Sequence, residues 1–188
     1  MALSTGVGRL FWAVPIDEQI RRALEKRLRA DLAGKPPPGR VPRADGWHIT
    51  LRFLGEVTQS QYDTLVKEWR VSPAGEGFDI AFRGLGAFPH PGKAAVLWMG
   101  IEDAEAGLSR LAARAEATAV AAGFEAERRA FHPHLTVSRI RPPKDLRELI
   151  SRANAPAISM RVETVVLFRS HLGSDGARYE AVDRFPLG

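Results

Sequence analysis

The sequence contains no cysteine among its 188 residues. This absence excludes disulfide bonds, thiolate zinc sites, iron–sulfur clusters and a cysteine nucleophile, and it fits a reducing compartment. Lysine is scarce as well, because 22 of the 27 basic residues are arginine. No apolar run approaches the roughly 20 residues of a membrane-spanning helix, and the first residues carry no targeting signal. We therefore expect a soluble, cytoplasmic protein that does not act at a membrane.

The rest of the composition is typical of a folded protein, with 45% hydrophobic and 26% charged residues. A chain of this length buries roughly 70% of its unfolded surface, so we expect a single domain over residues 1–188, made of two lobes. The formal net charge is +5. An arginine-rich basic protein favours a phosphate-bearing partner, because the guanidinium fork matches two phosphate oxygens. A genome whose codons favour arginine gives the same composition, and composition alone does not separate the two explanations.

Strand and helix patterns alternate along the chain. Apolar and alternating runs predict strands at 9–14, 47–54, 77–87, 94–101, 133–138, 159–170 and 178–185. Apolar residues at helical spacing predict a helix after a cap at Thr58 or Ser60 and three others at 18–32, 104–122 and 144–153. Asp17 is a suitable cap for the first helix, and Pro142-Pro143 stand where a helix start tolerates proline.

One strand pattern occurs twice, and each copy has a histidine followed two residues later by a threonine. In the first copy, alternation places His48, Thr50 and Arg52 on one face, and the apolar residues between them on the other, namely Ile49, Leu51 and Phe53. In the second copy, His134 and Thr136 share one face. A strand and a long helix precede each copy. The sequence therefore indicates a diverged duplication, an α+β fold of two lobes whose antiparallel sheets face each other across a central cleft.

Paired His-x-Thr segments suit chemistry on a phosphate. Histidine exchanges a proton near neutral pH, with a reference pKa of about 6.5, so two histidines can act as acid and base in one reaction. A threonine hydroxyl on the same face can donate a hydrogen bond to a phosphate oxygen. A single copy carries little weight, since a strand histidine among apolar neighbours is usually structural. Two copies with matching alternation favour the cleavage or formation of a phosphodiester.

The segments around these residues resemble the two-histidine phosphoesterase superfamily, and within it the RNA 2′,3′-cyclic phosphodiesterases, also called 2′-5′ RNA ligases. The resemblance covers nearly the whole chain and implies a bilobal α+β fold with its site in the cleft. It is carried by RLFWAVPIDEQIRRAL at the start, WHITLRFLGEV around His48, GLGAFPHPGKAAVLWMGIE in the middle, FHPHLTVSRIR around His134 and VVLFRSHLGSDGARYEAV near the end.

The resemblance also implies roles for individual residues. His48 and Thr50 match the first motif of the family, and His134 and Thr136 match the second. In the family, the first histidine is taken to give a proton to the leaving ribose 3′ oxygen, and the second to accept one from the attacking water. The implied reaction opens an RNA 2′,3′-cyclic phosphate end to a 2′-phosphate with no metal ion or other cofactor. A 5′-hydroxyl RNA end acting as nucleophile would instead join two ends through a 2′-5′ bond.

Two arginines are candidates for holding the phosphate, on different grounds. In the family an arginine commonly follows the second histidine by five residues, and Arg139 stands there. By strict alternation, however, Ser138 rather than Arg139 shares the face of His134, so the resemblance requires the strand to twist, bulge or end near Ser138. Arg52 shares the face of His48 and is a candidate phosphate contact on spacing alone.

Other polar residues receive simpler interpretations. His132 lies close to the second motif, but no carboxylate cluster accompanies it, so we expect no metal site. His90 and His171 are assigned to loops or the surface, and Arg128-Arg129 to a solvated pair rather than an RNA contact. The four tryptophans are assigned to packing rather than base stacking, and Tyr179 to the lip of the cleft.

Two other functions stay open on the sequence. The motifs address only the phosphate, so a phosphodiesterase that acts on small nucleotide cyclic phosphates has the same signature as one that acts on RNA. A module that binds RNA ends without turnover would also be basic, but it would leave both threonines without a role. We expect a monomer whose partners are RNA ends with a 2′,3′-cyclic phosphate and, for ligation, RNA ends with a 5′-hydroxyl.

Overall fold

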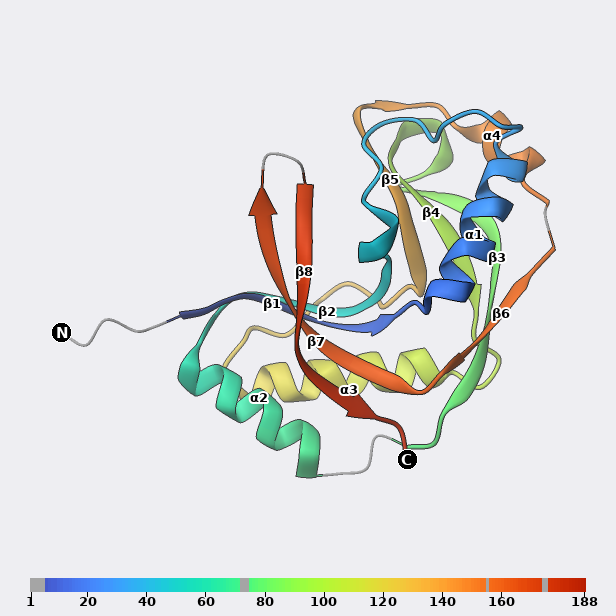
Figure 1. The fold of residues 1–188 in the computed structure, drawn as a ribbon. Helices are drawn as coiled ribbons and strands as arrows, with labels where there is room; N and C mark the ends of the chain where they lie inside the picture. Colours follow the sequence, from blue (N-terminus) through green and yellow to red (C-terminus); the bar gives the residue numbers. More distant parts are fainter. Residues whose placement is uncertain (1–5, 72–74, 155, 174–175) are drawn as a thin grey trace.

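The computed structural model describes residues 6–71, 75–154, 156–173 and 176–188. They form two antiparallel four-stranded sheets with helices around them (Figure 1). The spatial order in sheet A is β2 (His48–Thr58), β1 (Gly6–Pro15), β7 (Thr164–Gly173) and β8 (Gly176–Pro186). The spatial order in sheet B is β5 (His134–Lys144), β4 (Ala94–Glu102), β3 (Phe78–Phe88) and β6 (Ile158–Val162). The predicted α+β class with two antiparallel sheets is confirmed.

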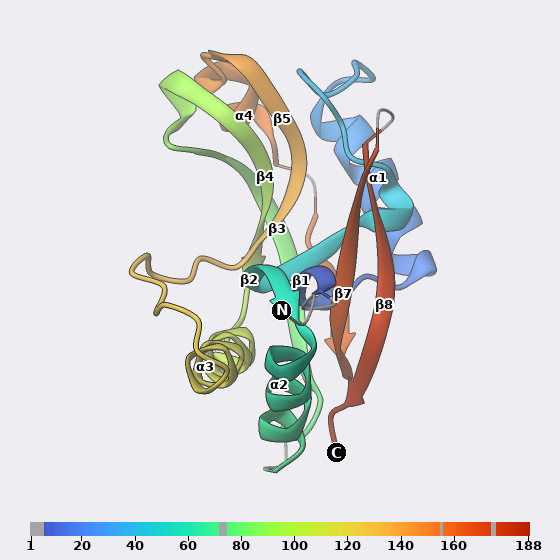
Figure 2. The same cartoon turned by 90° about the vertical axis from the view of Figure 1, so that its left-hand side faces the viewer.

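The two strands that carry the His-x-Thr motifs are the adjoining edges of the two sheets. β2 is the outer strand of sheet A, β5 is the outer strand of sheet B, and the two strands contact each other. Figure 2 shows β3, β4 and β5 as a strongly curled layer that faces sheet A. His48 and His134 are the first residues of β2 and β5. The junction of the sheets therefore brings the two motifs together.

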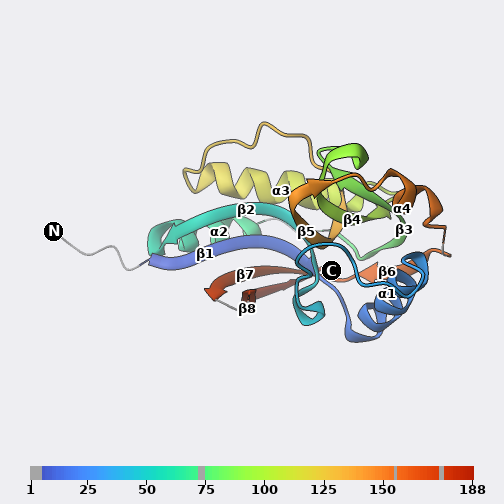
Figure 3. The same ribbon diagram turned by 90° about the horizontal axis from the view of Figure 1, so that it is seen from above.

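Each of two long helices packs against the sheet that does not contain the strand preceding it. α1 (Glu18–Asp31) follows β1 but packs beside β6, and its buried Arg27 donates from Nη1 to the carbonyl of Phe82 in β3. α3 (Gly107–Ala121) follows β4 but packs against β2 and α2 (Gln59–Val71). Figure 3 shows α2 and α3 beside β1 and β2, with α1 near β6. This arrangement fixes the two sheets relative to each other, because separating the sheets would break the packing of both helices.

One continuous cluster of buried apolar side chains runs through both sheets in the described part of the chain. The stripe expected on α1 lies in it, with Leu24 and Leu28 buried. Trp12 of β1 stacks on Trp69 of α2 with ring centroids 4.2 Å apart, which agrees with a packing role for these tryptophans. The helices of the described residues include none that is both long enough and apolar enough to cross a membrane.

The helix ends agree with the sequence prediction in one case and differ from it in two. Thr58 and Gln61 form a capping box before α2, with Gln61 N–H 3.3 Å from Thr58 Oγ1 and Thr58 N–H 3.0 Å from Gln61 Oε1. Asp17 occupies the cap position of α1 but makes no side-chain capping hydrogen bond. Pro142-Pro143 lie in β5, not at the start of α4 (Arg147–Arg152). An edge strand tolerates proline because it need not donate on its outer side.

The single strand predicted at 159–170 is two strands. β6 ends at Val162 in sheet B, and β7 begins at Thr164 in sheet A. The chain therefore crosses from one sheet to the other at Glu163. Apolar residues continue on both sides of this residue, so the sequence pattern does not mark the crossing.

Candidate active site

A cavity of about 830 Å³ lies at the junction of β2 and β5. Its lining contains all five residues predicted for catalysis, namely His48, Thr50, His134, Thr136 and Arg139. This volume falls within the range of pockets that bind small organic molecules. The cavity therefore has room for a nucleotide as well as for the phosphate that the motifs suggest.

Both catalytic candidates among the histidines are fixed by the same backbone contact. Nδ1 of His48 lies 2.7 Å from the carbonyl oxygen of Gly46, and Nδ1 of His134 lies 2.7 Å from that of His132. A carbonyl oxygen only accepts hydrogen bonds, so each Nδ1 carries the hydrogen. In the neutral ring Nε2 is then the basic nitrogen. The repeated contact gives both histidines the same tautomer, with Nε2 left for a ligand.

An aromatic side chain packs edge-on against each imidazole. Tyr179 of β8 meets His48 with ring centroids 4.9 Å apart and an interplanar angle of 84°. Phe88 of β3 meets His134 at 5.0 Å and 90°. Gly46 permits the first of these contacts, because a Cβ there would lie 3.0 Å from the Tyr179 ring. Tyr179 also lines the cavity, so it holds the His48 ring as well as bordering the cleft.

The pKa values of both histidines are lowered. Burial is the largest cause for His48 and brings its pKa to about 4, with further lowering by the charges of Arg139 and His134. Burial also lowers the pKa of His134, and His132 and Arg139 add to the effect. Burial raises the pKa of Tyr179, and the charge of Arg139 partly offsets this increase. Arg139 therefore lies near three titrating groups, and both histidines of the free protein are neutral at pH 7.

A β-bulge in each motif strand changes the alternation of side chains beyond the threonine. Against β1, the register of β2 shifts between Thr50 and Arg52. Against β4, the register of β5 shifts between Thr136 and Ser138. Each shift adds one residue to the motif strand, and the extra residue reverses the alternation that follows it. The two bulges occupy equivalent positions in the two lobes.

The equivalent positions that follow the two bulges hold residues of different chemistry. Arg139 lines the cavity, whereas Ser138 is turned into the interior, where its hydroxyl has no hydrogen-bond partner among the described residues. The equivalent residue in β2 is Phe53, which also lines the cavity and is 47% exposed. Its ring stacks on Phe11 at 5.3 Å and 4°. The expectation that Phe53 faces away from His48 is wrong, because the bulge precedes it.

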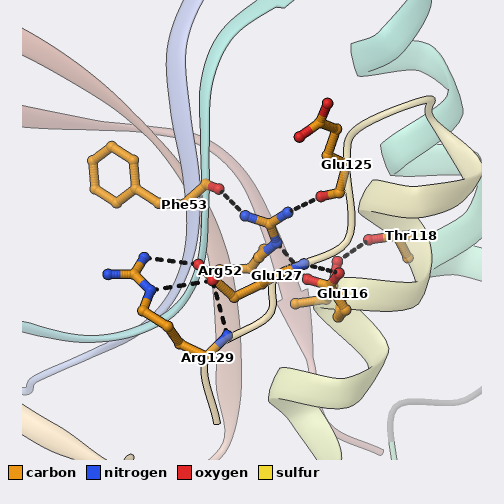
Figure 4. Close-up of polar contacts among 8 residues, drawn as sticks. Arg52, Phe53, Glu116, Thr118, Glu125, Glu127 and Arg129 are labelled. Atoms are coloured by element: carbon orange, nitrogen blue, oxygen red, sulfur yellow. Dashed lines mark hydrogen bonds and ion pairs between the residues drawn. The ribbon is translucent and has the colours of Figure 1, made fainter. Parts of the chain in front are cut away.

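The guanidinium of Arg52 is held by protein groups, although the residue borders the cavity. Its Nε pairs with the Glu116 carboxylate of α3. Its Nη1 donates to the carbonyl of Phe53 at 2.7 Å, and its Nη2 to that of Glu125 at 2.6 Å. Figure 4 shows the guanidinium surrounded by these acceptors.

The remaining histidines differ in their surroundings. His132 lines the cavity, with its ring 6.4 Å from that of His134 and 5.0 Å from that of Trp98. His90 is exposed, and His171 lies on β7 with Nε2 2.9 Å from a Glu180 carboxylate oxygen. Within the described ranges, no three His, Asp or Glu side chains are grouped as metal ligands.

Sequence reasoning missed Phe53 as a residue of the cavity, although one signal was present. Phe53 follows His48 by five residues, as Arg139 follows His134. Comparing the two motifs position by position would have paired the two residues despite their different chemistry.

The chain is similar to known proteins in both sequence and fold. Residues 17–174 match the family model of the 2′-5′ RNA ligase superfamily. The RNA 2′,3′-cyclic phosphodiesterase of Methanothermobacter thermautotrophicus is 34% identical over 184 residues, which cover 95% of this chain and 98% of the relative. The protein of that name from Aeropyrum pernix is 32% identical over 160 residues, or 83% of this chain and 90% of the relative. The crystal structure of Escherichia coli LigT complexed with 3′-AMP has a TM-score of 0.78 and 28% identity, covering 96% of this chain and 98% of that one. The family expected from the two motifs is thus confirmed, and the chain belongs to the 2′-5′ RNA ligase superfamily.

Proposed function

We propose that this protein hydrolyses RNA ends that carry a 2′,3′-cyclic phosphate and leaves a 2′-phosphate. The observation that carries the proposal is a pair of imidazoles in one cavity, each with Nε2 as its basic nitrogen. The names of the relatives, RNA 2′,3′-cyclic phosphodiesterases, support this reaction. The 3′-AMP in the LigT structure supports a ligand of nucleotide size for this protein.

The reaction requires one proton to be removed and another to be supplied. His134 accepts a proton from water at Nε2 while the water oxygen bonds to phosphorus. The bond between phosphorus and the ribose 3′ oxygen breaks, and protonated His48 gives its Nε2 proton to that oxygen. The 2′ oxygen stays on phosphorus, so the product is a 2′-phosphate beside a free 3′-hydroxyl. Proton exchange with solvent then restores both histidines.

Three further side chains stabilise the charge on the phosphate. The hydroxyls of Thr50 and Thr136 line the cavity and have no hydrogen-bond partner among the residues that the structure describes. They can therefore donate to phosphate oxygens. The guanidinium of Arg139, close to both histidines, offers a planar fork to the same group. Donors held in place before the reaction stabilise the transition state with little reorganisation, and no step in this scheme uses a metal ion.

Ligation follows from the same arrangement. A 5′-hydroxyl RNA end takes the place of water, and His134 accepts its proton. The 5′ oxygen bonds to phosphorus, the 3′ oxygen leaves with the proton from His48, and a 2′-5′ phosphodiester results. Water and the RNA end compete for one position, so raising the concentration of 5′-hydroxyl ends shifts product from hydrolysis to ligation.

The reaction is tested with an RNA that ends in a 2′,3′-cyclic phosphate, incubated in excess chelator. The expected product is the 2′-phosphate. A 3′-phosphate would mean that the 2′ oxygen leaves and would contradict the proposed scheme. Salt-sensitive RNA binding without product at any pH would instead favour a binding module, and turnover of small cyclic phosphates but not of RNA would favour a nucleotide phosphodiesterase.

The low pKa of His48 predicts an acidic optimum for kcat/KM, which reports the free enzyme. His48 must be protonated to act as acid, and its pKa is about 4. Above about pH 6.5, His134 is already neutral, so the rate follows the protonated fraction of His48 and falls tenfold per pH unit. A bound phosphodiester anion raises the pKa of His48, so kcat declines at a higher pH than kcat/KM. Constant kcat/KM between about pH 6.5 and 8.5 would contradict this assignment.

Phe53 offers a stacking surface for the base of the terminal nucleotide. Its ring is 47% exposed and is backed by the buried Phe11. Stacking contributes about 1–3 kcal/mol per base, so we expect Phe53→Ala to raise KM for a mononucleoside 2′,3′-cyclic phosphate about 5- to 150-fold. Phe53→Trp should keep most of the affinity, and Leu172→Ala, which removes an exposed apolar side chain of β7, serves as control. Equal KM values for Phe53→Ala and the wild type would exclude the stacking role.

A further inference from the structure

A series of polar contacts connects the edge of sheet A to the segment that leads into β5. Arg52 pairs with Glu116 of α3 and donates to the carbonyl of Glu125 at 2.6 Å. Oε1 of Glu116 accepts the N–H of Glu127 at 2.8 Å. The Arg52–Glu116 pair thus binds segment 124–133 at two points of its backbone (Figure 4).

These contacts help to hold segment 124–133 in place. The segment contains no helix or strand, yet several of its residues line the cavity beside the histidines, namely Glu127, Arg129, Ala130, Phe131 and His132. The side chains of Arg52 and Glu116 are only 13% and 28% exposed. Water and salt therefore compete with this pair less than with an ion pair at the surface.

Arg129 is the last residue in this series of contacts. Glu127 accepts hydrogen bonds from Nε of Arg129 at 3.1 Å and from Nη2 at 2.8 Å, and also from its backbone N–H. The side-chain contacts use two of the five N–H groups of a guanidinium. The side chain of Arg129 is 87% exposed, so its other N–H groups are open to a ligand. Glu127 therefore orients the guanidinium and leaves three of its five N–H groups for a ligand.

Three arginines of the described residues border the cavity, and two already have a role. Arg139 lies beside the histidines, and Arg52 is held by Glu116 and two carbonyl groups. Arg129 is the third. In Figure 4 the Phe53 ring and the Arg129 guanidinium both point away from α3. A base on Phe53 and a phosphate on Arg129 would therefore lie on the same side of the cavity.

We propose that Arg129 binds the phosphate that precedes the terminal nucleotide of an RNA, and that the Arg52–Glu116 pair positions it. This inference rests on the proposed function and names its substrate class, an RNA chain rather than a mononucleotide. It gives Arg52 a positioning role in place of the phosphate contact expected from strand spacing. It also gives Arg129 a ligand, where the sequence suggested a solvated pair.

The experiment compares kcat/KM for two substrates with the same terminal base. One is a dinucleotide that ends in a 2′,3′-cyclic phosphate, and the other is the corresponding mononucleoside 2′,3′-cyclic phosphate. We expect the wild type to prefer the dinucleotide, and Arg129→Ala to reduce that preference about tenfold, since Glu127 and solvent offset part of the arginine charge. Arg128→Ala is the matched control: Arg128 is an exposed neighbour that does not line the cavity, and its variant should keep the preference.

The positioning role is tested by combining variants. Arg52→Ala and Glu116→Gln should reduce the dinucleotide preference as Arg129→Ala does, and neither should reduce it further in the Arg129→Ala background. If Arg52 instead contacts the reacting phosphate, Arg52→Ala lowers kcat on both substrates alike, and that result overturns the positioning role. Arg129→Ala changes an exposed side chain, so it tests the phosphate contact even if Arg52→Ala does not fold.

The outcomes separate this inference from the proposed function. Equal preference in the wild type and Arg129→Ala overturns the phosphate contact while leaving cyclic phosphodiesterase activity intact. Absence of wild-type turnover on both substrates contradicts the proposed function itself. The preference of the wild type should also fall with rising salt, and that of Arg129→Ala should fall less, because one phosphate contact has been removed.

Discussion

Replacing His48 or His134 by alanine lowers kcat for an RNA 2′,3′-cyclic phosphate by about 10²- to 10⁴-fold in each variant. In the proposed mechanism each imidazole handles one of the two protons, and its ring is held by a 2.7 Å contact from Nδ1 to a backbone carbonyl. Alanine removes the Nε2 through which the proposed mechanism moves the proton. The measurement is steady-state hydrolysis in excess chelator, followed by separation of the 2′-phosphate product.

A matched control distinguishes this loss from a general effect of removing a histidine. His90 is exposed, lies between β3 and β4 and does not line the cavity, so His90→Ala should turn over like the wild type. Because the two imidazoles act in one step, the double variant should lose less than the product of the two single losses. Wild-type rates in both single variants would refute the two-histidine mechanism.

Replacing Arg139 by alanine lowers kcat by about 10²- to 10³-fold, the usual cost of removing a donor that stabilises a transition-state oxyanion. Arg139→Lys should recover little, because an ammonium group lacks the planar fork that matches two phosphate oxygens. Arg141→Ala is the control, since Arg141 is exposed on the same strand two residues later and does not line the cavity.

Arg139→Ala should also change the pH dependence of kcat/KM. The charge of Arg139 lowers the pKa of both His48 and His134, so its removal raises both pKa values. The pH profile of kcat/KM for Arg139→Ala should then move toward higher pH as the maximum falls. A loss of rate without this movement would mean that Arg139 does not lie beside the histidines in solution.

The sequence predicts the motif strands well as far as the threonines and less well beyond them. Alternation places His48 and Thr50 on one face of their strand, and His134 and Thr136 on one face of theirs. All four residues line the cavity. It does not indicate a bulge, because a bulge depends on pairing with β1 or β4 and not on local residue type.

Beyond each bulge, alternation misses a residue of the cavity. It selects Arg52, which borders the cavity but is held by protein groups, and Ser138, which is buried, and it misses Phe53 and Arg139. The family resemblance pointed to Arg139 correctly as a lining residue because it carries information about the folded strand. The resemblance assigns no role to Phe53, and its apolar character favours a place in the core.

Long-range packing is the other part of the fold that local patterns do not reveal. The helical periodicity of α1 predicts an apolar stripe but not its partner, which is the opposite sheet. The crossing at Glu163 depends on which sheet each neighbouring strand joins. Both features result from tertiary contacts between distant segments, and both help to place β2 beside β5.

The division of roles between the two histidines is the central claim, and a change of leaving group tests it most directly. In an RNA end whose cyclic phosphate has sulfur in place of the 3′ oxygen, the leaving thiolate needs no proton, because a thiol is far more acidic than an alcohol. His48→Ala should regain most of its lost rate on this substrate, while His134→Ala should stay slow because water must still be deprotonated. Rescue of His134→Ala but not of His48→Ala would contradict the assignment of His48 as acid and His134 as base.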